Sequence, residues 1–448
     1  MNNQNNSAIH TIIQSAGPNF DINRPDTEGE LSLHCAVNNG DVGITLTLLS
    51  YGAHVNSISS IPWRIQATKI HTKDDHPLVL AAELGDTPLV TLLLHKGANP
   101  NGLTSYRIHD RVSGTSKLIR SKGAIHWAVA RKDVALVNIL LHYGARPDLG
   151  GPRGDNAFHL VVSCISWWTY HDGQHTTWNM RNQQCMEQCK ILQLLLNHCP
   201  NYKVVNLLNA NGCSPLYQAV VYGCIRKVKM LLDAGADPNL CRCSSYGNGS
   251  RTSLHAAVDN GYHDIAQTLL HNGADLNLTN FCGHTPLLSN MLRCKRWDVM
   301  DATLIVHGAN LEVMNSQRAT LIGICIINMK GECEATCRLL FHAGCSLSGE
   351  SWQRPFNRAH NRVEELCDWL RTRKHNPRTL KDLSRISIRK FLSEKVTNGR
   401  SIVGSLLNLP LPRRLQEHLL LTDIVDLDCH TSESGVFEPR VTPDTYPN

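Results

Sequence analysis

The chain has 448 residues, 17 of them cysteine, and a formal net charge of +6. That length is too great for one compact core and favours a repeat array with an appendage. The charge is too small for a dedicated nucleic-acid-binding protein. We find neither a secretory signal nor an apolar run of the ~20 residues that a membrane span needs. We therefore expect a protein with reduced thiols that is located in the cytoplasm, with the nucleus left open as a second location.

A unit of about 33 residues recurs through the first 345 residues. Each copy has a short turn, a Leu-His-x-Ala-like helix start, a second apolar helix and a Gly-Ala turn. Leu254, Leu287 and Leu321 begin three successive copies. A single helix pair of this kind cannot bury its apolar face, so the copies must stack. Residues 1–348 resemble an ankyrin repeat array of about eight repeats, in which the first is degenerate and the fourth is interrupted.

A histidine occupies the same position in four of these repeats: His34, His126, His159 and His255. The resemblance to ankyrin repeats implies that each one hydrogen-bonds its repeat turn and is not a general base. We find no nucleophile elbow, phosphate-binding loop or HExxH motif in the chain. The sequence therefore favours a binding protein over an enzyme.

Two insertions lengthen successive inter-repeat fingers, at residues 57–75 and 102–122. Both are basic, and each carries an aromatic residue. Insertions in repeat proteins form loops that often bind, so we predict part of a substrate-docking face here; solvated loops with no partner are the alternative. A solenoid would hold the fingers side by side, and a positive surface suits an acidic partner. The candidate substrate contacts are Trp63, Arg64, Tyr106, Arg107, Arg111 and Lys117.

A longer insertion, residues 163–190, separates the two helices of the fourth repeat. His171, His175, Cys185 and Cys189 in it could ligate zinc if they converged. The usual zinc motif has a tighter cysteine spacing, and the two cysteines can pack as small apolar groups at the start of the second helix. We predict no metal and no other cofactor.

The repeat pattern ends near residue 349, and residues 349–377 are predicted to form a capping helix and a linker. Leu380, Ser384, Ile388 and Phe391 then recur at helical spacing, and Leu383 and Ile386 widen the apolar stripe. A helix this short is marginal alone, so its apolar face must dock on something.

Two prolines, Pro410 and Pro412, fix the chain after this helix. Each lacks an N–H and has a restricted φ, so residues 409–412 are predicted to be extended. An amphipathic helix follows, with Leu415, Leu419 and Leu420 on one side. Residues 423–448 are rich in Thr, Pro, Glu and Ser, which predicts a disordered tail.

Residues 378–422 resemble a SOCS box. Its first helix carries Leu, then Cys, Ser or Ala, then an aliphatic residue at four-residue intervals, and Leu380, Ser384 and Ile388 match this pattern. Ser384 stands where Cys is commoner, and His418 stands where Tyr is usual. The resemblance implies that the first helix binds elongin C of the elongin B/C pair, through Leu380, Leu383, Ser384 and Ile388.

The family's Leu-Pro-aliphatic-Pro element is matched by Leu409, Pro410, Leu411 and Pro412. The resemblance implies that these residues select a cullin, which we expect to be cullin 5 with its RING-box subunit. An ankyrin array followed by a SOCS box is the layout of the ankyrin repeat and SOCS box family. That layout implies an all-α fold, an ankyrin solenoid of helix pairs with hairpin fingers followed by a small three-helix box.

The family resemblance implies a non-catalytic adaptor of a cullin–RING ubiquitin ligase. The repeats would hold a protein substrate near the charged E2 and so promote its ubiquitination and degradation. The alternative is an ankyrin scaffold without a ligase, whose C-terminal helices only cap the array. We expect no nucleic-acid or membrane partner in either case.

Overall fold

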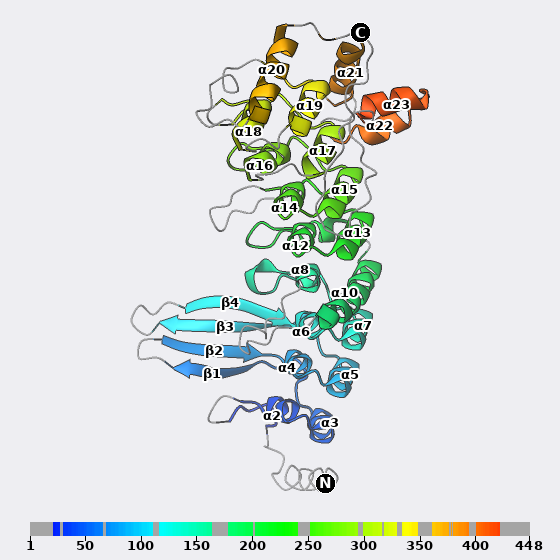
Figure 1. The fold of residues 1–448 in the computed structure, drawn as a ribbon. Coiled ribbons are helices and arrows are strands. Elements are labelled where there is room, and N and C mark those ends of the chain that lie inside the picture. The colour runs from blue at the N-terminus through cyan, green and yellow to red at the C-terminus, as the bar shows by residue number, and fades with distance from the viewer. Residues whose placement is uncertain are drawn as a thin grey trace. The chain divides into compact units, whose positions relative to one another are not determined.

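The computed structural model divides the chain into two compact units, residues 1–218 with 233–235, and residues 219–232 with 236–448 (Figure 1). The structure describes residues 21–26, 30–65, 69–110, 116–163, 178–199, 202–240, 251–293, 299–315, 318–328, 334–347, 361–375, 378, 380–393 and 400–421. The predicted tail and most of the degenerate first repeat lie outside these residues.

The first unit consists of helix pairs joined by turns or by the two fingers, as the repeat pattern predicts. Its helices are α2 (Ser32–Asn38), α3 (Val42–Ser50), α4 (Pro77–Leu84), α5 (Thr87–His95), α6 (Ala124–Arg131), α7 (Val134–His142), the short 3₁₀ helix η1 (Pro152–Gly154), α8 (Ala157–Val162), α10 (Trp178–His198) and α11 (Tyr202–Val205). α12 (Pro215–Val221) and α13 (Ile225–Asp233) follow at the boundary of the units.

The second helix of three successive repeats begins after an aspartate. The carboxylate oxygens of Asp41, Asp86 and Asp133 accept hydrogen bonds from backbone amides three residues on, at 2.9, 2.9 and 3.0 Å. Each bond satisfies one of the amides that the first turn of a helix leaves unpaired. One side of each of these helices is buried, through residues such as Leu48, Leu89 and Leu136. The repeat pattern therefore fixes both where these helices begin and which side they bury.

The two fingers form one antiparallel sheet of four strands in the order β1-β2-β3-β4 (Figure 1). The prediction that the fingers lie side by side is confirmed, because β2 and β3 come from different fingers and Lys73 pairs with Tyr106. The strands are β1 (Ser59–Ile65), β2 (Lys69–Asp75), β3 (Leu103–Asp110) and β4 (Ser116–Gly123). The first unit is thus a stack of helix pairs with one sheet added at its fingers.

The recurrent histidines bridge to the segment that follows their own repeat. The Nε2 atoms of His34, His126, His159 and His255 lie 2.8–3.0 Å from a backbone carbonyl in the following turn. Burial lowers the pKa of all four imidazoles. They are therefore neutral structural groups at pH 7, since burial disfavours the charged form.

The fourth repeat differs from its prediction at one end. α10 begins at Trp178 and runs for 21 residues, so it takes in the second half of the predicted insertion and both of its cysteines. His171 and His175 lie outside the described residues. Over the part of the chain that is described, no group of three or more His, Cys, Asp or Glu side chains is arranged to hold a metal ion. Among the described helices, none combines the length and apolarity of a bilayer span.

The second unit continues with helix pairs and ends in the C-terminal helices. Its members are α14 (Ser253–Asp259), α15 (His263–His271), α16 (Pro286–Arg293), α17 (Val299–Val306), α18 (Leu321–Asn328), α19 (Glu334–Ala343), α20 (Asn361–His375), α21 (Leu380–Phe391), α22 (Val403–Leu407) and α23 (Arg413–Leu420). α20 lies where a capping helix was predicted. Its Trp369 packs edge-on against Phe341 of α19, with ring centroids 5.4 Å apart.

Candidate protein-binding site

The last three helices share a small core of their own. Leu392, Ile402, Leu406, Leu419 and Leu420 are buried together. They come from the residue that follows α21, from α22 with its preceding residue, and from α23. The segment predicted to be a three-helix box therefore does fold as three short helices around one apolar cluster.

The face of α21 predicted to bind a partner is exposed. The exposed fractions are 86% for Leu380, 45% for Leu383, 38% for Ile388 and 59% for Phe391, and Ser384 is exposed among them. Side chains three or four residues apart share one helix face. We call these five residues the open face of α21. A soluble protein rarely exposes such a row of large apolar side chains unless something covers it.

The opposite side of α21 carries two arginines that are buried in this unit. Arg385 is 2% exposed, and its guanidinium donates to Asp382 Oδ1 at 2.6 Å. The same group lies 3.4 Å from His418 Nδ1 of α23 and 3.5 Å from His342 Nδ1 of α19. Arg385 thus joins the first and last helices of the box to the last helix pair of the array.

Arg389 makes the deeper connection. It is 5% exposed, and it donates to Leu419 O of α23 at 2.6 Å, to Val306 O at 3.1 Å and to Ile305 O. The last two carbonyls belong to the C-terminal turn of α17, where helix carbonyls lack partners within the helix and the helix dipole is negative. Burial, and then the charge of Arg385, lower the pKa of Arg389 to about 9. The guanidinium therefore stays charged at neutral pH.

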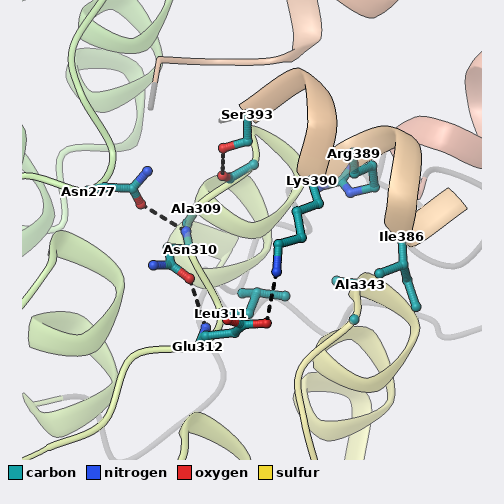
Figure 2. Close-up of a pocket in the computed structure, with 12 residues that line it drawn as sticks. Asn277, Ala309, Asn310, Leu311, Glu312, Ala343, Ile386, Arg389, Lys390 and Ser393 are labelled. Carbon is teal, nitrogen blue, oxygen red and sulfur yellow. Dashed lines mark hydrogen bonds and ion pairs between the residues drawn. The ribbon is translucent and has the colours of Figure 1, made fainter. Parts of the chain in front are cut away.

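A pocket of about 220 Å³ lies where α21 meets the turns after α17 and α19 (Figure 2). At its wall Lys390 Nζ lies 3.3 Å from Glu312 Oε1, and Ser393 Oγ donates to Gly308 O at 3.1 Å. Ile386 was predicted to widen the apolar stripe formed by Leu380, Ser384 and Ile388, but it packs away from them, against Gly344 at the turn after α19. The reason is angular: Ile386 follows Arg385 and so points toward the array rather than to the open face.

His307 holds the start of α22. Its Nδ1 lies 2.6 Å from Ser401 Oγ, and its carbonyl accepts a hydrogen bond from Ile402 N at 2.9 Å. Burial, followed by the neighbouring His271 and Arg389, lowers the pKa of His307 to about 4. The imidazole is therefore neutral at pH 7. At acidic pH, keeping it buried and neutral reduces the free energy of unfolding, because the unfolded state binds the proton more readily.

The leucines and prolines of residues 409–412 point in different directions. Leu409 and Leu411 pack against the core of the three helices, whereas Pro410 and Pro412 are exposed. Pro412 is extended, at φ −53° and ψ 142°. The prediction of a fully extended segment was wrong at Pro410, because Leu411 N donates to Leu409 O at 2.7 Å and closes a three-residue turn. The φ of proline is close to the value that such a turn needs.

Gln416 fixes this segment from α23. Its Nε2 donates to Leu409 O at 3.0 Å and to Leu407 O at 3.4 Å. Sequence reasoning missed this role, and it missed Arg385 and Arg389. Glutamine and arginine are usually exposed on helices, so the only available signal was the four-residue spacing of the two arginines.

Five of the six predicted substrate residues lie in the strands of the fingers, and the strand register assigns them to different sides of the sheet. Arg64 pairs with His71, His71 pairs with Ile108, and Ile108 pairs with Lys117. Arg64 and Lys117 are therefore assigned to the same side of the sheet. Tyr106 lies two positions from Ile108, on the same side, and Arg107 lies on the other side of the sheet. Trp63 lies at a bulge in β1. Arg111 lies outside the described residues.

Family models match both parts of the chain. The SOCS box model matches residues 376–420, and ankyrin repeat models match residues 73–105, 211–242 and 241–287. In domain composition, a set of ankyrin repeats followed by a SOCS box, the chain is similar to the ankyrin repeat and SOCS box proteins. The SOCS box so matched contains α21, α22 and α23, and therefore both the open face and the buried arginines.

Individual proteins are similar to this chain over different shares of its length. Ankyrin repeat and SOCS box protein 16 of Mus musculus is 25% identical over 384 residues, which cover 78% of this chain and 75% of the relative. E3 ubiquitin-protein ligase XBAT33 of Arabidopsis thaliana is 38% identical over 101 residues, 22% of this chain and 19% of the relative. Among solved structures, the ankyrin repeat domain of Bcl-3 covers 58% of this chain and 94% of that domain, with 24% identity and a TM-score of 0.39.

Proposed function

We propose that this ankyrin repeat and SOCS box protein is a non-catalytic, substrate-recognition adaptor of a cullin–RING ubiquitin ligase. The SOCS box and the similarity to ankyrin repeat and SOCS box protein 16 support an adaptor role of this general kind. In our proposal the open face of α21 binds elongin C of the elongin B/C pair, residues 409–412 select cullin 5, and the ankyrin array holds a protein target.

The observation that carries the proposal is the division of α21 into two faces. One face is fixed to the array by buried arginines, and the other leaves Leu380, Leu383 and Ile388 in solvent. These exposed side chains contribute little to the stability of the chain itself, since they bury little area. Leu380 and Ile388 are at positions where the SOCS box pattern has its elongin-binding residues. A helix that only capped the array would turn its apolar side inward.

The elongin contact is tested by truncating exposed leucines. Leu380→Ala combined with Leu383→Ala removes two anchors, and we expect co-purification with elongin B/C to fall at least thirty-fold, since a buried interface leucine is worth ~2–5 kcal/mol. Leu46→Ala is the matched control: Leu46 is 44% exposed on α3, almost as Leu383 is at 45%. The control should bind elongin B/C normally.

Wild-type chain that fails to capture purified elongin B/C would reject this function. It would favour an ankyrin scaffold without a ligase. Equal losses from the double variant and from Leu46→Ala would show that the effect does not arise at the open face.

The cullin contact is tested separately at the two exposed prolines. Pro410→Ala with Pro412→Ala frees a preorganised segment, so ordering it on binding costs more. We expect the elongin complex to form normally and its affinity for cullin 5 to fall. Parallel measurements with cullin 2 decide which cullin is selected. Loss of elongin and cullin together would indicate that the box had unfolded and that the prolines have no specific role.

A further inference from the structure

The sheet of the two fingers has two faces, and its register assigns basic positions to each. Residues paired across antiparallel strands share a face, and neighbours along a strand alternate. Lys69, Lys73, Tyr106 and Lys117 fall on one face, which we call the front face, and Arg64 joins them through its pairing with His71. Arg107 pairs with Thr72 and with Leu118, and Arg120 pairs with Ser105. Both arginines therefore fall on the other face, which we call the back face.

The acidic residues of the sheet leave the front face positive. The four strands contain seven Lys or Arg residues and three Asp residues. Asp74 and Asp75 are buried at the root of the sheet, where Ser105 Oγ donates to Asp74 Oδ2 at 3.0 Å. Asp110 is the remaining acid, and it pairs in register with Lys69. Lys122, at the root of β4, lies 4.0 Å from the centre of the Trp127 ring.

We propose that the front face is the docking surface for an acidic segment of the target protein, with Tyr106 at its centre. Calling the bound protein a target for ubiquitination rests on the adaptor function proposed above; the docking itself does not. Strands lie ~4.8 Å apart, so the positions on β1 and β4 are separated by roughly 14 Å. An extended acidic segment of four or five residues spans that width. Complementary charge speeds encounter and rejects other partners.

The proposal is tested by reversing charges on one face at a time. The front variant carries Lys73→Glu and Lys117→Glu, and the back variant carries Arg107→Glu and Arg120→Glu. Each changes the net charge equally, so the long-range field is matched and only the face differs. The probe is a fluorescein-labelled ten-residue glutamate peptide, titrated with full-length chain by fluorescence anisotropy. Circular dichroism checks that both variants keep the wild-type fold.

We expect the front variant to bind the peptide at least ten-fold more weakly and the back variant to lose less than three-fold. Equal losses, or a greater loss from the back variant, would overturn the proposal, because net charge or the other face would then control binding. So would the absence of binding by the wild-type chain, or tighter binding to a single-stranded oligouridine than to the peptide. Elongin B/C co-purification is measured on the same samples: wild type that binds the peptide but not elongin would reject the adaptor function and leave the docking surface standing.

Discussion

Arg389→Met is expected to loosen the SOCS box from the ankyrin array. The guanidinium of Arg389 donates hydrogen bonds to three backbone carbonyls, those of Leu419, Ile305 and Val306. Methionine fills a similar volume but donates nothing, so all three oxygens lose this donor. Hydrogen bonds to a charged group are worth ~1.5–3 kcal/mol each, and removing a buried charged partner costs ~3–5 kcal/mol in total.

Hydrogen exchange measured by mass spectrometry reports the loss of stability separately for each helix. At ~1.4 kcal/mol per factor of ten, amides of α21 and α23 should exchange at least a hundred-fold faster, and those of α14 and α15 should not change. Lys390→Met is the control, because Lys390 is the next residue and makes an exposed ion pair with Glu312 that is worth ~0–1 kcal/mol. Unchanged exchange in Arg389→Met, or the same increase in both variants, would refute the view that the arginine holds the box.

Two further predictions concern the same region. The pKa of His307 is about 4 in the folded state and near 6.5 in the unfolded state, so the unfolded state binds the proton first as the pH falls. The free energy of unfolding should therefore drop by about 3 kcal/mol between pH 6.5 and 4, and His307 should not change it above that range. Denaturant titrations of wild type and His307→Gln across these pH values should show a shallower loss in the variant, and parallel curves would contradict the role of His307. Gln416→Ala removes the donor to Leu409 O and Leu407 O, so surface plasmon resonance should show cullin binding several-fold weaker with elongin binding intact. Gln416→Glu, which cannot donate, should behave like the alanine variant; normal binding by either one would mean that the amide does not order the prolines.

Periodic features of the fold were predictable because their cause is local. The spacing of Leu254, Leu287 and Leu321 predicted the stacked repeats, and all three are buried. The helical spacing of Leu380, Ser384 and Ile388 likewise predicted one shared face. Which side of α21 docks on the array was not predictable, because it depends on carbonyls at the end of α17, far away in the sequence.

Non-local pairing explains the remaining differences. That the fingers lie together followed from their place in successive repeats, but the strand register that separates Arg107 from Tyr106 needed the structure. From the sequence, Ile386 and Leu383 are both apolar residues of the same helix and look equivalent. In the structure Ile386 packs against Gly344, a contact that the sequence does not reveal. The turn at Pro410 depends on one backbone bond that no spacing rule contains.

The open face of α21 also bears on how much of this protein a cell can hold. Four large apolar side chains exposed in one row are a surface that chaperones and degradation factors recognise, and a site of self-association at high concentration. Chain produced in excess of whatever covers the row is therefore exposed to removal, whereas covered chain is protected. The steady amount of the protein should then follow the supply of its binding partner more closely than the rate of its own synthesis.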